Sequence, residues 1–503
     1  MQHAFTCTLA QGALTLLLVL LACTRAPAQV VQFHLDGSPE GTVSGAPATA
    51  RLFPGAAFVD SVEGQGVEPG AVGPALSIPV SPETWGERGT LAFRFRTSRT
   101  IRAAKLLGPD AKPIQATLLT CPVGKIILTE GPAHPILRVI VAQPGSSKPL
   151  QGNIYWSHLK GGRWYHLAVA WDLPSGAVDT YLNGVLQEDT FLEDVGPLML
   201  DPDAPLELGG SMGESDRRAS LAIDEVQLFD DYMTEAHLAP TLADRRINAL
   251  EGEGRTVYDE PLDLSPYRLR IAYEADFSAP LNWVHEDSLF DGDKRVRRPD
   301  GAEWVLEGPG KAWTEDGRLW METHGGDDGH LVLWNTREFP SDFLLEYGFS
   351  PDDSNRGLHI VFLGAKSLSG GSIFDLDLPL RGGLFRNYHS GELNCYHISG
   401  FATSETGRPR RTTNVRKNQG FFLVTCGDDR ITGQGPGPHL FRLLKVGGKI
   451  ALETRGLIAS RFDDDGETYG PVWQEGLIGL RIMGYTGKAS FSHFRVWEVH
   501  PAE

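Results

Sequence analysis

Residues 163–172 read RWYHLAVAWD, and this stretch decides the fold of the first half of the chain. It is an apolar and aromatic run between turn signals, which is typical of a β-strand. A second run, VDTYL at 178–182, leads into Asn183 and Gly184, the strongest short signal of a β-hairpin. Upstream, residues 90–96 alternate apolar and polar side chains like a half-buried strand. Residues 206–210 and 222–229 extend the strand pattern, and a helix-like piece at 234–244 follows it.

Five segments of this half form a recognisable set: GTLAFRF (89–95), GRWYHLAVAWD (162–172), VDTYLNGVLQ (178–187), LELGG (206–210) and AIDEVQLFDDYMTEAHL (222–238). The set resembles the laminin G-like, concanavalin A-like domains, which implies a two-sheet antiparallel jelly roll over residues 30–246. Trp164, Tyr165 and Trp171 are then expected in the core rather than stacked on sugar rings, and Asp224 is expected to tie a turn or the closing strand. Because this fold hosts lectins, glycosidases, lyases and spacers, it fixes no function. We expect an accessory domain that binds glycan or packs against its neighbour.

Residues 247–266 are polar, charged and weakly periodic, which is typical of a linker. The strand pattern restarts at Tyr267, and twelve short strands without a long amphipathic helix predict a second β-sandwich over residues 267–503. Four segments there form a second set: PLNWVHED (280–287), WNTREFPSDFLLEYGFSPDDSNRGLHIVFLGA (334–365), RNYHSGELNCYHIS (386–399) and GLIGLRIMGYTGKASFSHFRVWEV (476–499).

The second set resembles the YesU-like family of bacterial proteins with a concanavalin A-like fold, some of which come from gene neighbourhoods for polysaccharide breakdown. This resemblance implies a fold and a substrate class but no reaction. The whole chain is therefore expected to be all-β, with two concanavalin A-like antiparallel jelly-roll sandwiches in tandem.

Composition and the first residues bear on partners and location. The 503 residues are 41% hydrophobic and carry a formal net charge of -18, which argues for a globular protein and against nucleic acid or an anionic membrane surface as a partner. Residues 12–22 are an apolar run too short to span a bilayer, and the cleavage signal Ala26, Pro27 and Ala28 follows. We expect a signal peptide over residues 1–28 and an exported protein. A lipid anchor at Cys23 is the alternative, and no later transmembrane segment is predicted.

Removal of the signal leaves Cys121, Cys395 and Cys426. An odd number leaves at least one free thiol. Cys395 and Cys426 belong to the same predicted domain and would pair in an oxidising compartment, while three buried free thiols are the alternative. The sequence leaves both open.

The densest group of polar side chains is RNYHSGELNCYHISG at 386–400. Such a mixture suits a site that holds a polar ligand or moves a proton. Its second part, 392–398, is expected to be a strand, so Asn394 and Tyr396 share one face and Cys395 and His397 share the other. We expect Asn394 and Tyr396 to face a groove, because Cys395 suits a core or a disulfide.

Three functions remain open for the second domain. β-Elimination on a uronate polysaccharide needs a base, an acid and a group that neutralises the carboxylate. Jelly-roll lyases use His, Tyr, Arg and Asn or Gln for this, and by that resemblance the candidate catalytic residues are Tyr396, His359 and Asn394. Glu392 is a further catalytic candidate, as a carboxylate for hydrolysis. The candidate substrate-binding residues are Arg386, Asn387, Tyr388, His389, Arg416 and Trp334. Arg416 belongs to the basic run 408–417, which is either a clamp for an acidic sugar or a solvated loop.

Hydrolysis is the second function, since a retaining glycosidase needs two close carboxylates. The E-x-D-x-x-E string of laminarinase-type members is absent, and Phe374 stands where the first Glu of such a string is needed. Glu392 with Glu346 or Glu322 would supply a pair from different strands. The third function is non-catalytic: a glycan-binding or cell-surface protein.

No metal or cofactor is assigned a definite site. Two acidic turns, one at 463–466 and one at Asp327 and Asp328, have carboxylates that could bind a structural calcium ion. The alternative is that each turn is an acidic loop exposed to solvent. The spacing of an EF-hand is missing. A zinc site at Glu322, His324 and His330 is not expected. The sequence gives neither the glycan nor the oligomeric state.

Overall fold

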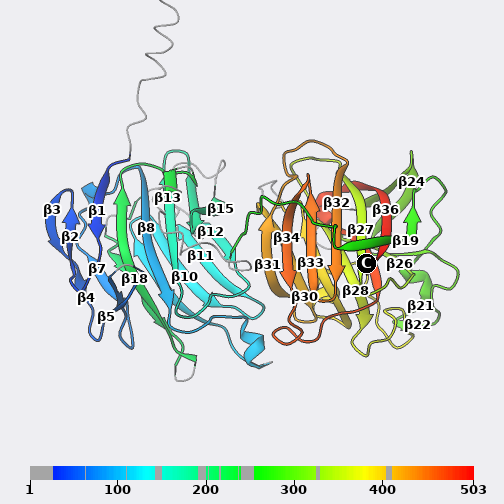
Figure 1. Cartoon of the computed structure of the whole chain (residues 1–503), viewed down its shortest axis with the longest axis horizontal. Coiled ribbons are helices and arrows are strands. Elements are labelled where there is room, and N and C mark those ends of the chain that lie inside the picture. The colour runs from blue at the N-terminus through cyan, green and yellow to red at the C-terminus, as the bar shows by residue number, and fades with distance from the viewer. Residues whose placement is uncertain are drawn as a thin grey trace, which may run out of the picture.

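The computed structural model describes residues 27–502 except for 63, 109, 142–149, 191–199, 202, 215–216, 236, 239–253, 325–328 and 404–409. The described chain is almost entirely β-structure and forms two sandwiches side by side along its longest axis (Figure 1). This confirms the predicted fold class, all-β with two concanavalin A-like sandwiches in tandem. The predicted signal peptide up to residue 26, Cys23, Asp327 and Asp328 lie outside the described residues. Among the described helices, none is long and apolar enough to cross a membrane.

The first sandwich consists of two antiparallel sheets that enclose one apolar core. One sheet has the order β15 (Val185–Thr190), β14 (Ala177–Leu182), β13 (Trp164–Asp172), β8 (Arg88–Thr97), β18 (Ala219–Phe229), β1 (Gln29–Phe33), β2 (Glu40–Val43) and β3 (Ala46–Thr49), with β5 (Ala57–Asp60), β6 (Gln65–Glu68) and β17 (Gly210–Met212) beside it. The other has the order β12 (Leu150–Tyr155), β11 (Pro135–Val141), β10 (Gly124–Glu130), β9 (Ile114–Cys121), β16 (Leu206–Leu208), β7 (Leu76–Ile78) and β4 (Arg51–Leu52).

Strand β13 is buried on both faces, which explains its nearly continuous apolar sequence. Tyr165 and Trp171 face the core between the sheets, as predicted, and Trp164 is also buried. Asn183 and Gly184 both have positive φ values, 49° and 80°, in the two-residue turn between β14 and β15. Positive φ at both central residues is the requirement of a type I′ turn, so the hairpin prediction is confirmed.

Asp224 stabilises an irregular point in β18, where the pairing with β8 shifts its register. Its Oδ1 accepts a hydrogen bond from the Glu225 backbone N–H at 2.8 Å, and its Oδ2 accepts one from the Ser61 hydroxyl. Glu225 has a φ of 50°, a strained value for a side chain of this kind. The predicted structural role of Asp224 is confirmed.

The second sandwich also has two large sheets. The back sheet has the order β24 (Gly310–Glu315), β25 (Arg318–Thr323), β36 (Lys488–Pro501), β27 (Phe343–Pro351), β32 (His439–Val446), β33 (Lys449–Thr454) and β34 (Leu457–Asp463), with β19 (Tyr267–Ala275) on β36. The front sheet has the order β20 (Trp283–His285), β23 (Trp304–Glu307), β26 (Leu331–Asn335), β35 (Leu477–Ile482), β28 (His359–Ser367), β29 (Leu393–Gly400), β30 (Thr412–Asn418) and β31 (Phe422–Asp428). A small hairpin joins β21 (Phe290–Asp291) to β22 (Lys294–Arg295).

The outer face of the front sheet carries a second apolar core, separate from the one between the sheets. Trp334 of β26 stacks on Phe362 of β28 with ring centroids 5.2 Å apart. Ile373, Phe374 and Tyr388 pack over these rings from a covering segment, residues 373–389, which ends in the short helix α3 (Phe385–His389). Roughly half of this face is therefore closed by the chain itself.

A buried ionic network fastens the covering segment to the sheet. The Arg381 guanidinium donates two hydrogen bonds to the Glu307 carboxylate on β23, and the Tyr388 hydroxyl donates a third at 2.5 Å. Glu286 in η5 (Glu286–Leu289) accepts from the backbone N–H of Arg381 at 3.2 Å and from Arg295 at 3.2 Å. Burial, then the neighbouring Glu307 carboxylate, raises the pKa of Glu286 to about 7.

The two domains meet along β31 and at Arg255, where the described chain enters the second domain. The Arg255 backbone N–H donates to Gln187 Oε1 on β15 at 2.7 Å, and its guanidinium donates to Asp428 Oδ1 at the end of β31 at 2.7 Å. Cys426 Sγ on β31 donates to the carbonyl oxygen of Tyr155 on β12 at 3.2 Å. This one residue, Arg255, thus joins both domains directly.

The thiols of Cys121, Cys395 and Cys426 are free and buried. The sequence left two alternatives open, and the structure has the second of them: three buried free thiols, without a disulfide between Cys395 and Cys426.

Candidate functional site

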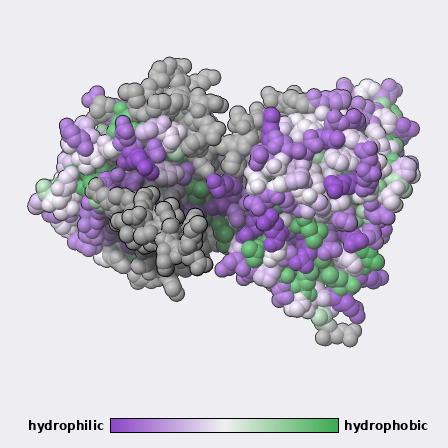
Figure 2. Space-filling view, turned by 90° about the horizontal axis from the view of Figure 1, so that it is seen from above, coloured by the Kyte–Doolittle hydropathy of each residue, from purple (hydrophilic) through white to green (hydrophobic). Residues whose placement is uncertain are grey.

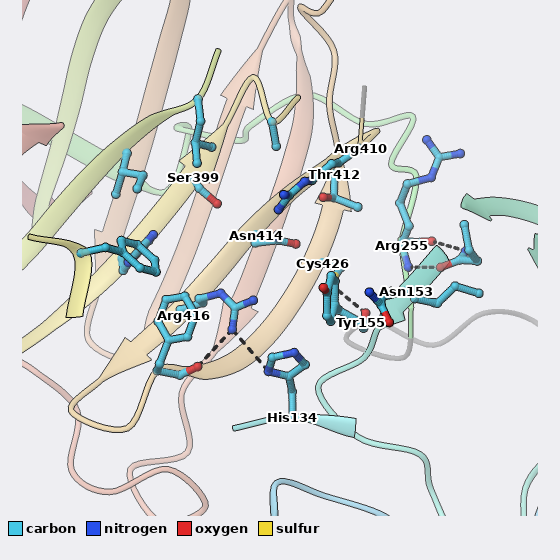
Figure 3. A pocket seen from close by; sticks show the side chains of 18 residues that line it. His134, Asn153, Tyr155, Arg255, Ser399, Arg410, Thr412, Asn414, Arg416 and Cys426 are labelled. Carbon is cyan, nitrogen blue, oxygen red and sulfur yellow. Dashed lines mark hydrogen bonds between the residues drawn. The ribbon is translucent and has the colours of Figure 1, made fainter. Parts of the chain in front are cut away.

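A cavity of about 410 Å³ lies between the two domains (Figure 3). Its floor is the uncovered half of the front sheet, from β28 to β31. The first domain supplies His134, Asn153 and Tyr155 at the opposite wall. On the face seen from above, both hydrophilic and hydrophobic residues are visible where the two domains meet (Figure 2). We call this cavity the cleft.

Strand alternation decides which side chains reach the cleft. On β29, His397 and Ser399 point outward, whereas Tyr396 and Ile398 belong to the core between the sheets. On β30, Thr412, Asn414 and Arg416 line the cleft, and Val415 lies in the core. The register places Ser399 beside Asn414 and His397 beside Arg416. Two neighbouring strands therefore present a polar row toward the first domain.

Arg416 is the central charge of the cleft. Its side chain is only 8% exposed, and it points toward His134 across the domain junction (Figure 3). Arg416 Nη1 donates to the carbonyl oxygen of Phe421 at 3.0 Å and lies 3.5 Å from His134 Nδ1, while the guanidinium stacks over the Phe421 ring at 4.0 Å. No carboxylate of the described residues pairs with it. Burial lowers the pKa of Arg416 to about 10, so the group is still a cation at neutral pH.

The two cleft histidines are neutral at neutral pH. Burial, followed by the Arg416 charge, lowers the pKa of both His134 and His397 well below the usual value of 6.5. His397 lies among aromatic rings, with Phe362 at 5.3 Å and Phe421 at 5.6 Å between centroids. His134 Nε2, His397 Nδ1 and Asn414 Oδ1 are buried and have no hydrogen-bond partner in the described chain. Three unsatisfied polar atoms around one cavity are the arrangement of a ligand site.

The charge of the lining is one-sided. Arg255, Arg410 and Arg416 line the cleft, and its described lining includes neither Asp nor Glu. Cations, amides, hydroxyls and aromatic rings together suit a polar ligand with a negative group.

The predicted orientation of β29 is wrong. Tyr396 faces the core, where its hydroxyl donates to Asp464 Oδ2 at 2.5 Å, and Lys417 Nζ donates to the same oxygen at 2.7 Å. Cys395 faces outward, but the covering segment packs over it. The physical reason is that this outer face carries an apolar core of its own, so a small apolar side chain is suited to the outward position.

His359, the other principal catalytic candidate, is also in the core between the sheets. Its Nε2 lies 3.0 Å from the Tyr347 hydroxyl, and its ring stacks on Phe349 at 4.2 Å. Burial lowers its pKa to about 3. Tyr396 and His359, two of the candidate catalytic residues, therefore do not meet in an open groove.

Of the predicted site residues, only Arg416 lines the cleft. Trp334 and Tyr388 are buried in the outer core, and Asn387 Nδ2 donates to the Arg381 carbonyl oxygen at 3.0 Å. The remaining candidates lie at other places: Arg386 and Glu392 are exposed, and Asn394 and His389 are half-buried outside the lining.

Sequence reasoning missed the cleft residues His134, Asn153, Tyr155, His397, Ser399 and Asn414. β30 gave only a weak signal: Thr412, Asn414 and Arg416 share one face, but Thr413 and Lys417 on the other face are polar too. The first-domain residues had no local signal.

Asp464 and Asp465 belong to the acidic turn for which the sequence left a structural calcium ion as one alternative. Asp464 pairs with Lys417, and Asp465 accepts a hydrogen bond from the Thr468 hydroxyl at 2.6 Å. Within the described residues, no group of three or more His, Cys, Asp or Glu side chains could hold a metal.

Replacing Tyr396 with Phe tests the corrected assignment. We expect the free energy of unfolding to fall by about 1–3 kcal/mol, because a buried hydrogen bond to a charged acceptor is lost. Ligand binding or turnover in the cleft should not change. Urea unfolding measures the first quantity and calorimetric titration the second. Lost turnover at unchanged stability would restore Tyr396 as a catalytic residue.

Comparison with known proteins assigns both halves. A family model described as a domain of unknown function, DUF1961, matches residues 293–496, and one described as the concanavalin A-like lectin/glucanases superfamily matches residues 143–239. A solved Bacillus subtilis protein of unknown function with a galectin-like fold is similar, with 29% identity and a TM-score of 0.39 over 47% of this chain and 100% of that one. Domain 4 of AbnA, a GH43 extracellular arabinanase from Geobacillus stearothermophilus, has 18% identity and a TM-score of 0.31 over 44% of this chain and 100% of that domain.

The uncharacterized protein YesU of Bacillus subtilis (strain 168) is 34% identical over 202 residues. These residues are 40% of this chain and 90% of YesU. The match is too short to span both domains, and the DUF1961 model lies within the second domain, which carries the front sheet and the floor of the cleft. The chain therefore belongs to the YesU family, joined here to a first domain of laminin G-like, concanavalin A-like type.

Proposed function

We propose that this protein is an exported glycan-binding protein whose cleft holds an acidic saccharide. The observation that carries the proposal is Arg416, a nearly buried cation without a carboxylate partner among the described residues. A buried charge without a counter-ion is costly, and an anionic ligand would offset that cost. The planar guanidinium matches a carboxylate or a sulfate with two parallel hydrogen bonds.

The rest of the lining supports a sugar as the carrier of that negative group. Asn153, Ser399 and Asn414 offer amide and hydroxyl groups for the hydroxyls of a saccharide. Phe385 and Phe421 offer apolar surfaces for its C–H faces. The cavity volume lies in the range of small-molecule sites.

The test is calorimetric titration of the whole protein with matched pairs of oligosaccharides. One pair is oligogalacturonate and neutral galacto-oligosaccharide of equal length. Alginate oligosaccharides and a sulfated galactan series are titrated as further arms. These arms show whether the cleft binds a carboxylate or a sulfate group. We expect binding to an acidic series, none to its neutral partner, and weaker binding as salt rises. Equal binding to the neutral partner, or no binding in any arm, would refute the proposal.

A second candidate is β-elimination on a uronate in the same cleft. His134 favours it, because its neutral imidazole lies beside the cation that would hold the carboxylate. Its Nδ1 faces the Arg416 guanidinium, which can only donate, so Nδ1 carries the lone pair that a base needs and the unpartnered Nε2 carries the N–H. In such a reaction the base takes the proton α to the carboxyl group, a double bond forms, and the bond to the leaving oxygen breaks as that oxygen takes up a proton. Tyr155, whose ring meets the His134 ring edge-on at 5.0 Å, is the candidate proton donor.

Ultraviolet absorbance of unsaturated products distinguishes this candidate from binding alone. Incubation with polygalacturonate or alginate should produce the absorbance if elimination takes place, and the His134→Ala variant should lose it. Binding without product leaves the non-catalytic function. Hydrolysis by two carboxylates has no support in the cleft, because its described lining contains none.

A further inference from the structure

The cleft is closed on one side by the covering segment. Ile373, Phe374 and Tyr388 fill the outer face of the front sheet over β23, β26 and β28, so no groove continues in that direction. Phe385 of helix α3 forms the cleft wall on this side. The ion pair between Arg381 and Glu307 anchors the segment that carries this wall to β23.

The opposite side is closed by the first domain. At the outer edge of β31, the Leu423 backbone N–H lies 3.4 Å from the Ala133 carbonyl oxygen, and Cys426 Sγ lies 3.2 Å from that of Tyr155. His134 and Tyr155 therefore meet β31 as a wall, and the front sheet does not continue past them as an open surface.

The cleft is also closed at the lower end of β30. There the Gly420 backbone N–H donates to the His389 carbonyl oxygen at 3.2 Å, which ties the turn after β30 to helix α3. Toward the start of β30 the side chains become more exposed: Arg416 is buried, and Asn414 and Thr412 are half-buried. Arg410, just before the strand, is exposed. The cation without a partner is thus at the deep end, and the second cation is at the mouth.

We infer that the cleft takes the end of an acidic saccharide chain, or a short acidic oligosaccharide, and not an internal segment of a long chain. This rests on the proposed function. An internal segment must enter and leave the cleft. Among the described residues, walls from the covering segment, the first domain and the turn after β30 leave one mouth. The terminal acidic residue lies at Arg416, and the next residue extends toward Arg410. The first domain supplies the wall that makes this selection.

The experiment measures stoichiometry as a function of chain length. Galacturonate di-, tetra- and hexasaccharides and polygalacturonate are titrated into the whole protein at equal concentrations of chains, with an alginate series in parallel. We expect one protein per chain at every length, and an affinity that rises little beyond the shortest chain that fills the cleft. The number of bound proteins rising in proportion to chain length would overturn the inference while leaving acidic-saccharide binding intact.

Modified chain ends provide an independent readout. Removal of the carboxylate from the reducing-end sugar and, separately, from the non-reducing-end sugar are compared on the same tetrasaccharide. One of the two changes should weaken binding at least about tenfold, the loss expected for one charge-assisted contact, and the other should have little effect. Equal affinity for both modified forms and the parent would contradict chain-end recognition. No binding of any acidic chain would refute the proposed function itself, and Arg416→Gln is the control that assigns the signal to the cleft.

Discussion

Replacing Arg416 with Gln will weaken the binding of acidic saccharides by roughly 10- to 100-fold, the loss expected when a hydrogen-bonded charge is removed from a buried contact. Gln keeps a donor and much of the side-chain length but cannot neutralise an anion. Calorimetric titration with the tightest-binding acidic oligosaccharide measures the change. The affinity for that ligand should also lose most of its salt dependence, because the principal cation is gone.

The same substitution should leave the fold intact. Arg416 is buried without a carboxylate partner among the described residues, so its removal relieves a desolvation cost while the contact with Phe421 is lost. We expect the free energy of unfolding to stay within about 1 kcal/mol of the parent or to rise, as at other sites where function requires a strained arrangement. Arg386→Gln is the matched control, since Arg386 is exposed and outside the cleft lining. Equal losses in both variants would show that general charge, and not the cleft, binds the ligand.

Replacing Arg381 with Met will destabilise the second domain by about 3–5 kcal/mol, because one partner of a buried ion pair is removed and the other keeps its charge. Glu307 is fully buried, and its carboxylate accepts two guanidinium hydrogen bonds of Arg381, whose third goes to the Ile373 carbonyl oxygen. The covering segment loses its ion pair to β23 at the same time and keeps only the Tyr388 hydrogen bond to Glu307 among the bonds of this network to that strand. Urea unfolding of the whole protein, followed by tryptophan fluorescence, measures the loss.

Arg298→Met is the control for this second prediction. Arg298 pairs with Asp375 at 2.6 Å, but its side chain is 57% exposed. Exposed ion pairs contribute at most about 1 kcal/mol, so this variant should unfold close to the parent. If Arg381→Met were no less stable than Arg298→Met, the network would not fasten the covering segment.

The fold was predictable because its signals are local. The sequence RWYHLAVAWD and the dipeptide Asn183-Gly184 specify a buried strand and a hairpin turn within a few residues, and the structure has both. The family resemblance supplied the tandem arrangement. None of this required knowledge of contacts between distant parts of the chain.

The site was only partly predictable, for two physical reasons. Alternation assigns Tyr396 and Cys395 to opposite faces but does not say which face meets solvent, and the covering segment changed the answer by packing on Cys395. His134 meets Arg416 from the other domain, 282 residues away in sequence, and nothing in its local sequence marks that contact. Arg416 itself was found, because a basic residue next to a strand is visible in the sequence.

The junction at Arg255 has a consequence for solubility. β31 is the outermost strand of the front sheet, and its free edge is occupied by a parallel bridge from Arg255 to Cys426 and by the Thr256 backbone N–H, which donates to the Cys426 carbonyl oxygen at 3.1 Å. An uncovered edge strand is a template for pairing with other chains. The first domain and the segment after it therefore protect the second domain from aggregation, and proteolytic removal of both would leave that edge bare.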